Sequence, residues 1–231
     1  MKIQFILVEP GLPENIGASA RAIKTMGFDT LCLVKPCEWK TGKSRWVAHG
    51  SADILDNASL YESLKESLKG SDLSVATSSK YRTVKQDWVR ADELYSFIES
   101  KSESVKNISI VFGREESGLT NDEIRLCDIK SGIVMDSPYP SLNLAQAVMI
   151  YAYELSGLNK NIFTMTDQTD EKSFSILKIK IRKILSELGI NEHDNRYGRI
   201  MERISFLKDD DIHLVHSVCN SILESLSSIR E

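Results

Sequence analysis

The chain lacks the features that mark membrane, secreted and metal-binding proteins. Its opening apolar run, residues 3–8, is far too short to cross a membrane, and the start has no signal-peptide pattern. The four cysteines form neither a Cys-x-x-Cys pair nor a zinc-finger spacing. His213 and His216 are three residues apart, but no carboxylate or thiol pattern completes a metal site. These absences predict a soluble protein without a metal, in a reducing, cytoplasmic setting.

Positive charge is also scarce. The chain carries 29 lysines and arginines against 33 aspartates and glutamates, so its formal net charge is −4. This balance argues against an extended basic arm of the kind that binds nucleic acid, and any RNA binding must come from local patches. A hydrophobic fraction of 42% and a charged fraction of 27% are typical of a globular protein. The length suffices for one ordinary domain and a smaller one.

Hydrophobic runs alternate with helical patterns through most of the chain. Residues 3–8 and 30–34 are strand-like and flank a helical stretch, residues 15–26, that Gly27 ends. A crossover of this length joins parallel strands. Further strands are expected at residues 73–77, 108–112 and 133–135, and further helices at residues 61–69, 92–100, 121–126 and 142–155. The sequence therefore predicts an α/β fold with a parallel sheet and helices on both faces.

Composition changes near Gly157. Residues 158–170 are polar and are expected to form a linker. Beyond them, apolar residues recur at helical spacing in three stretches, and Gly189 ends the first. We therefore expect an α/β domain over residues 1–157 and a small α-helical domain over residues 171–231.

Three short segments rich in polar residues and glycine lie where a predicted strand gives way to a loop or helix. They are Asn15-Ile-Gly-Ala-Ser-Ala-Arg21, Val111-Phe-Gly-Arg-Glu-Glu-Ser-Gly-Leu119 and Ser141-Leu-Asn143. In an open α/β sheet, functional groups gather at the carboxyl ends of the strands. The segments supply amides, a guanidinium, carboxylates, a hydroxyl and glycines that permit close approach. Together they are suited to holding a nucleotide-like ligand beside a polyanion.

Each segment alone also has a purely structural interpretation. Asn15 and Ser141 are good N-caps, and Arg21 would then be an ordinary surface arginine. The two adjacent carboxylates that begin at Glu115 would simply be solvated. The functional interpretation is that Arg21 directs its planar fork at a phosphate and that Gly113 lets the backbone approach a ligand. A carboxylate would then orient Arg21 or accept bonds from loop amides.

Two basic segments contain aromatic residues. They are residues 35–51, with Lys43, Arg45, Trp39 and Trp46, and residues 80–90, with Lys80, Arg82, Lys85, Tyr81 and Trp88. Basic residues interleaved with aromatics suit phosphate contacts plus base stacking. Two solvated loops with ordinary charge runs are the alternative.

Taken together, the three segments resemble the motifs of the SpoU-type RNA 2′-O-ribose methyltransferases of the SPOUT class, and within them the TrmJ and LasT branch. The matching residues are Asn15-x-Gly-x-x-x-Arg21, Phe112-Gly-x-Glu-x-x-Gly-Leu119 and Ser141-Leu-Asn143. Arg45-Trp-Val-Ala-His-Gly-Ser51 and Tyr139-Pro140 favour the LasT-like members. The resemblance covers residues 1–157 strongly and the helical tail more loosely.

The resemblance implies a trefoil knot in the C-terminal part of the α/β domain, bound S-adenosyl-L-methionine, and a homodimer whose active sites draw on both chains. The implied cofactor-binding residues are Thr77, Ser78 and Ser79 in one loop, Gly113 in a second, and Ile133, Pro140, Ser141 and Leu142 in a third. The residues expected to bind RNA are Lys43, Arg45, Lys80, Arg82 and Lys85.

The implied reaction is methyl transfer to a ribose 2′-hydroxyl of tRNA or rRNA. The implied catalytic residues are Arg21, Asn15, Glu115, Ser141 and Asn143. Arg21 is the family's candidate for proton removal, but a guanidinium stays protonated because its pKa lies above about 12. We therefore favour a clamp on the phosphate beside the target ribose. Two alternatives stay open: a SPOUT enzyme that methylates a base nitrogen, and a non-catalytic RNA-binding module with the same fold.

Overall fold

The computed structural model describes residues 1–40, 42–78, 88–136, 142–160 and 174–228. At its centre is a seven-stranded sheet in which all neighbouring strands are parallel. The strands, in spatial order, are β3 (Ser59–Tyr61), β2 (Thr30–Val34), β1 (Lys2–Val8), β6 (Asn107–Phe112), β4 (Leu73–Thr77), β7 (Ile129–Gly132) and β5 (Trp88–Arg90). The predicted α/β fold with a parallel sheet is confirmed.

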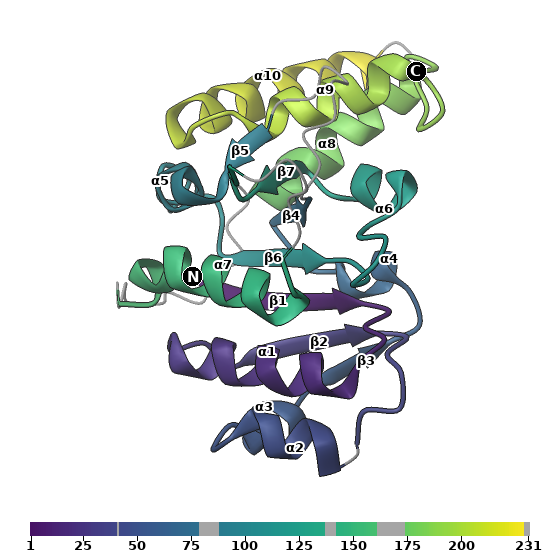
Figure 1. Ribbon diagram of the computed structural model, residues 1–231. Helices are drawn as coiled ribbons and strands as arrows, with labels where there is room; N and C mark the ends of the chain where they lie inside the picture. Colours follow the sequence, from purple (N-terminus) through teal and green to yellow (C-terminus); the bar gives the residue numbers. More distant parts are fainter. Residues whose placement is uncertain (41, 79–87, 137–141, 161–173, 229–231) are drawn as a thin grey trace.

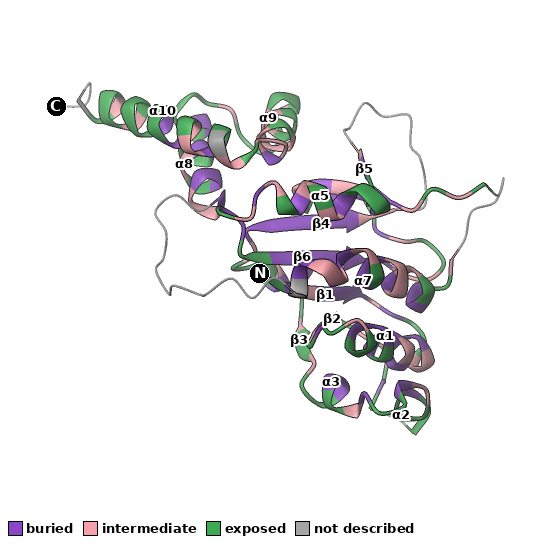
Figure 2. Cartoon of the chain, turned by 90° about the vertical axis from the view of Figure 1, so that its left-hand side faces the viewer, coloured by how far each residue is buried: buried purple, intermediate pink, exposed green. Residues whose placement is uncertain are grey.

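Helices cover both faces of this sheet (Figure 1). One face packs against α1 (Pro13–Thr25), α5 (Leu94–Glu99) and α7 (Leu144–Lys160), and the other against α4 (Leu64–Ser67) and α6 (Asn121–Leu126). Successive side chains of a strand point to opposite faces, so Phe5 and Leu7 join the first layer while Ile6 and Val8 join the second. The central strands are buried between these layers (Figure 2), which explains their continuous apolar sequences.

Two short helices, α2 (Gly42–Ala48) and α3 (Ala52–Asp56), lie beside α1. A Cβ added at Gly17 of α1 would lie 2.1 Å from the carbonyl oxygen of Ser44, so only glycine lets the two helices approach this closely. The basic segment of residues 35–51 therefore contains a helix that is fixed against α1. A 3₁₀ turn, η1 (Ala91–Glu93), precedes α5.

The strand expected at residues 133–135 is wrong. The strand is β7, which lies four residues earlier and pairs with β4 and β5 up to Gly132. The Ile133-Val-Met run has a stronger β-propensity than the residues of β7. Nevertheless, Lys130 and Ser131 are the residues that pair with both neighbouring strands. A Cβ at Gly132 would lie 2.4 Å from the Trp88 ring and 2.7 Å from the Ser78 carbonyl oxygen, so the end of β7 requires glycine.

The tail consists of α8 (Phe174–Glu187), α9 (Asn195–Ser205) and α10 (Asp209–Ser228) (Figure 1), and it packs against the segments that follow α5 and precede β7. The Nζ atom of Lys178 lies 3.0 and 2.9 Å from the two carboxylate oxygens of Asp128, which immediately precedes β7. The same carboxylate accepts hydrogen bonds from the amide and hydroxyl of Ser74 at 2.8 and 2.7 Å. The tail is thus bonded to the sheet through a buried ion pair.

The first residues of the segment expected as a linker are helical. Residues 158–160 belong to α7, and residues 161–170 lie outside the part of the chain that the structure describes. Among the described helices, none combines the length and apolar character needed to span a bilayer. Within the same residues, no group of three or more His, Cys, Asp or Glu side chains is arranged to hold a metal ion.

Candidate active site

Three side chains join the three motif segments in one hydrogen-bonded network. The Glu115 carboxylate, on the loop after β6, accepts a bond of 2.8 Å from the side-chain amide of Asn15 on α1. The side-chain oxygen (Oδ1) of Asn15 accepts a bond of 2.8 Å from the side-chain amide of Asn143, which immediately precedes α7. Glu115 also accepts bonds from the backbone amides of Gly11 and Leu12 at 3.0 and 3.3 Å. Because Asn15 uses both ends of its amide, its orientation is fixed.

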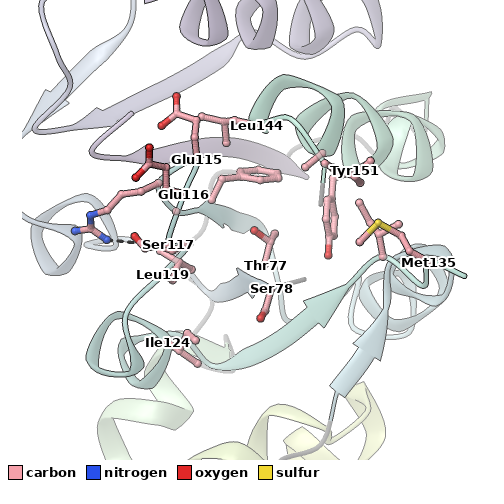
Figure 3. A pocket seen from close by; sticks show the side chains of 17 residues that line it. Thr77, Ser78, Glu115, Glu116, Ser117, Leu119, Ile124, Met135, Leu144 and Tyr151 are labelled. Carbon is pink, nitrogen blue, oxygen red and sulfur yellow. Dashed lines mark hydrogen bonds between the residues drawn. The ribbon is translucent and has the colours of Figure 1, made fainter. Parts of the chain in front are cut away.

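A cavity of about 240 Å³ opens at the carboxyl ends of β4 and β6 (Figure 3). It is lined by Thr77, Ser78, residues 112–119, Ile124, Ile133, Met135, Leu142, Leu144, Ala147 and Tyr151. Five of the residues that the resemblance assigns to the cofactor therefore share one cavity: Thr77, Ser78, Gly113, Ile133 and Leu142. The other three, Ser79, Pro140 and Ser141, lie outside the described residues.

The loop after β6 is closed by its own backbone. The amide of Arg114 donates to the carbonyl of Gly118 at 3.3 Å, and the amide of Gly118 donates back at 2.9 Å. A Cβ at Gly113 would lie 2.1 Å from the carbonyl carbon of Gly118, so glycine is needed for the loop to close. Gly113 lines the cavity as expected, and the atoms that a side chain at this position would meet belong to Gly118 and Leu119 of the same loop.

The helix starts differ from those predicted. Pro13 begins α1 and Leu12 is its N-cap, so Asn15 lies inside the first turn and its side chain is free to bind Glu115. At α7, the Asn143 side-chain oxygen accepts a bond of 2.9 Å from the amide of Ala145, as an N-cap does. Asn143 therefore has two roles, in the cap and in the network. Ser141, the expected cap, lies outside the described residues.

Arg21 lies on α1 two turns after its start, and its side chain is exposed. Among the residues that the structure describes, none forms a hydrogen bond or ion pair with its guanidinium. Arg21 does not line the cavity of its own chain. Its positive charge is therefore available to an anion that approaches from outside.

The Glu115 carboxylate is stabilised in its charged form. Partial burial raises its pKa, but the bonds from the Asn15 side chain and two backbone amides outweigh burial, so the pKa lies below its ordinary value. A carboxyl group with a lowered folded pKa stabilises the fold above its unfolded pKa, and this contribution is lost as pH falls through the folded value.

We therefore expect Glu115→Gln to be less stable than the wild type at pH 7, and the difference to shrink once the pH falls below about 4. Urea unfolding of both proteins between pH 7 and pH 3 measures this difference. A difference that stays constant over the whole range would show that the charge of Glu115 is not what the network stabilises.

Two of the five residues predicted to contact RNA are described, and both have acidic neighbours. The Nζ atom of Lys43 lies 3.5 Å from a carboxylate oxygen of Glu14, and Arg45 forms an ion pair with Asp56. Lys80, Arg82 and Lys85 lie outside the described residues. Of the two tryptophans in the first segment, Trp46 on α2 is 80% exposed and Trp39 is buried.

Arg114 is a site residue that the sequence did not single out. Its Nε atom donates to Glu9 at 2.9 Å, and its two terminal nitrogens each donate to a carboxylate oxygen of Glu123 at 3.0 Å. Thr120 and Glu123 form a capping box at the start of α6, and the Thr-x-x-Glu spacing was a readable signal for that part. The bond to Glu9 joins residues 105 positions apart and had no local signal.

The protein is an α/β protein whose cavity and polar network lie at the carboxyl edge of a parallel sheet, where such folds bind their ligands. Residues 2–153 match the model of the SpoU rRNA methylase family, and residues 171–226 match that of the C-terminal domain of the tRNA/rRNA methyltransferase LasT. The chain belongs to the SpoU rRNA methylase family. The resemblance drawn from the three motifs is thereby confirmed.

Individual relatives agree with this assignment. The chain is 37% identical over 227 residues to a protein named uncharacterized tRNA/rRNA methyltransferase LasT of Escherichia coli K12, covering 98% of this chain and 100% of that one. It is 41% identical over 154 residues to the tRNA (cytidine/uridine-2′-O-)-methyltransferase TrmJ of Cronobacter sakazakii, covering 66% and 62%. The crystal structure of TrmJ from Z. mobilis ZM4 is similar, with a TM-score of 0.67, 25% identity, and coverage of 96% of this chain and 99% of that one.

Proposed function

We propose that this protein transfers a methyl group from S-adenosyl-L-methionine to the 2′-hydroxyl of a ribose in RNA, with tRNA as the first substrate to test. The Glu115–Asn15–Asn143 network carries the proposal, because it joins the helix of Arg21 to the rim of the cavity. The names of the TrmJ and LasT relatives, which are tRNA and tRNA/rRNA methyltransferases, support it. With such a substrate, the proposed enzyme acts in the cytoplasm.

The cavity suits an adenosine-containing cofactor. Its walls combine residues 113–118 of the loop after β6 with the apolar residues Ile133 and Leu142. An adenine needs such a shaped apolar slot with a few hydrogen-bonding groups. When bound, S-adenosyl-L-methionine supplies a methyl group already activated by its sulfonium. The chain then has to place the ribose oxygen in line with that methyl group and assist removal of one proton.

Placement is the larger of these two tasks. Holding the reacting atoms about 3–3.5 Å apart contributes up to roughly 7–11 kcal/mol to lowering the barrier. We assign this task to Arg21, whose guanidinium clamps the phosphate next to the target ribose and stabilises negative charge as the hydroxyl loses its proton. Asn15 contacts the substrate or supports Arg21, and Glu115 fixes the orientation of Asn15.

We also propose a homodimer in which Arg21 of one chain faces the cavity of the other. Arg21 does not line the cavity of its own chain, so a single chain leaves the site incomplete. In addition, α7 is apolar on more than its buried side: Met149 and Ile150 are partly exposed and Tyr153 is 64% exposed. Exposed apolar side chains that gather on one helix often mark an interaction surface, and a second copy would cover this one.

The remaining architecture follows the family resemblance. We propose that the C-terminal part of the α/β domain forms a trefoil knot. We also propose a catalytic domain that ends with α7 and a separate helical domain from residue 171. Two distinct family models, matching residues 2–153 and 171–226, support this division.

We propose that RNA contacts the two basic segments. We assign phosphate contacts to Lys43, Arg45, Lys80, Arg82 and Lys85, and base stacking to the exposed ring of Trp46. Affinity for RNA is expected to fall steeply with salt, by roughly one counterion per phosphate contact. Filter binding between 50 and 200 mM salt, roughly the range over which such contacts weaken, measures the slope. A flat dependence would exclude these electrostatic contacts.

Product analysis tests the proposed reaction. Purified protein is incubated with methyl-labelled S-adenosyl-L-methionine and with tRNA from cells that lack this protein. The RNA is then digested with alkali. Ribose 2′-O-methylation leaves alkali-resistant labelled dinucleotides, which is the expected result. Label in a mononucleotide base would instead indicate a base methyltransferase. An absence of transfer, with no cofactor binding by calorimetry, would indicate an RNA-binding module.

A further inference from the structure

Arg114 connects two loops that the proposed reaction must keep in register. Its guanidinium donates to Glu9 on the loop after β1 and to both carboxylate oxygens of Glu123 on α6. A terminal nitrogen also lies 3.3 Å from the carbonyl oxygen of Gly118, within the loop that lines the cavity. The side chain is 24% exposed, and a planar fork with five N–H groups can serve these partners at once where a lysine cannot.

The loop after β1 is held at two points by consecutive residues of the loop after β6. Arg114 binds the side chain of Glu9, and Glu115 binds the backbone amides of Gly11 and Leu12. Only Pro13 and Glu14 then separate Leu12 from Asn15. The start of α1 therefore cannot move relative to the cavity without breaking one of these contacts.

Glu9 has an unusual backbone conformation at the point where Arg114 binds it. Its φ angle is +47°, in the left-handed region that residues other than glycine rarely adopt. Its amide donates to the carbonyl of Val34 on β2 at 2.8 Å, so its backbone is fixed to the sheet while its carboxylate is fixed to Arg114. A strained conformation persists only where its surroundings over-determine it, and such residues cluster at functional sites.

We propose that Arg114 is a positioning residue that holds the loop after β6 against the loop after β1. This contact fixes α1, and with it Asn15 and Arg21, relative to the methyl donor. This inference rests on the proposed function. It assigns to Arg114 a coupling role, in addition to closing its own loop through Gly118 and Glu123. Of the partners of Arg114, only Glu9 lies on the loop after β1, so the bond to Glu9 is the one that couples the two loops.

Variants at the two ends of the contact separate these roles. Glu9→Ala is expected to lower kcat by about tenfold, with calorimetric affinity for S-adenosyl-L-methionine unchanged, because the bonds to Glu123 and Gly118 persist. Glu9→Gln keeps an acceptor for Nε and is expected to restore most of the rate. Arg114→Ala is expected to weaken cofactor affinity and kcat together. Arg125→Ala, which removes an exposed arginine paired with Asp122 on α6, is the matched control and is expected to change neither.

A second readout does not depend on methyl transfer. Amide hydrogen exchange at residues 11–16 is measured with and without S-adenosyl-L-homocysteine, and the cofactor product is expected to slow exchange in the wild type but not in Glu9→Ala. Equal slowing in both proteins, or a wild-type kcat in Glu9→Ala, would overturn the coupling role. If the wild type methylates no ribose, the proposed function fails, and the exchange experiment still decides whether Arg114 couples the two loops.

Discussion

Replacing Arg21 with alanine is expected to lower the rate of methyl transfer to RNA by about 100- to 1000-fold, the usual effect of removing one group that stabilises developing charge. Cofactor affinity should not change, because Arg21 is assigned to the phosphate beside the target ribose and not to the cofactor. Arg21→Lys keeps the charge but loses the planar fork, so an intermediate rate is expected. Single-turnover methyl transfer at saturating cofactor measures the loss. Wild-type rates in both variants would remove Arg21 from the mechanism.

Mixed dimers reveal which chain supplies Arg21. One chain carries Arg21→Ala, and the other carries Ala147→Trp, which fills the cavity but leaves Arg21 intact. If Arg21 acts across the dimer, random mixing of the two inactive variants restores about a quarter of wild-type activity, because half of the dimers are mixed and each has one complete site. If Arg21 acts within its own chain, the mixture stays inactive.

Replacing Lys178 with alanine is expected to destabilise the protein by about 3–5 kcal/mol, the range for breaking one side of a buried ion pair. The side chains of Lys178 and Asp128 are 9% and 8% exposed, so the carboxylate would be left buried without its cation. Asp128 also accepts two bonds from Ser74 on β4, so the loss extends into the sheet. Urea unfolding followed by far-ultraviolet circular dichroism measures the change in the free energy of unfolding.

An exposed ion pair provides the control for that measurement. The Nζ atom of Lys24 lies 2.6 Å from a carboxylate oxygen of Asp53, and the two side chains are 43% and 55% exposed. Because solvent screens this pair, Lys24→Ala is expected to cost much less stability than Lys178→Ala. The double variant Lys178→Met with Asp128→Leu removes both buried charges and is expected to recover part of the lost stability. A loss below about 1 kcal/mol for Lys178→Ala would mean that the tail is an independent appendage rather than a part of the folded unit.

The central strands could be predicted from sequence because they are buried on both faces. Residues 30–34 and 73–77 have the bounds expected from their apolar runs. The edge strands β3 and β5 could not, since Ser-Leu-Tyr and Trp-Val-Arg are three residues long and pair on one side only. At β7, Gly132 and the hydrogen-bond ladder decided the strand position against the propensity of the residues that follow.

The candidate site was predictable as a set of segments and not as a set of contacts. The order of the motifs indicates that Asn15, Glu115 and Asn143 meet, because the carboxyl ends of parallel strands share one edge. Their hydrogen bonds could not be predicted, because the sequence around Asn15 is equally compatible with an N-cap. Only the start of α1 at Pro13 shows that Asn15 lies inside the helix, where its side chain binds Glu115. The role of Arg114 depends on Glu9, which is too distant in sequence for any local pattern to indicate it.

A map of ribose-methylated positions in total RNA, compared between cells with and without the protein, tests the proposed function most directly. We predict that at least one 2′-O-methylated nucleotide disappears when the protein is absent, and that the wild type restores it while Arg21→Ala does not. Identical maps, or a lost position that the Arg21→Ala variant restores in full, would contradict the assignment of a ribose methyltransferase that depends on this guanidinium.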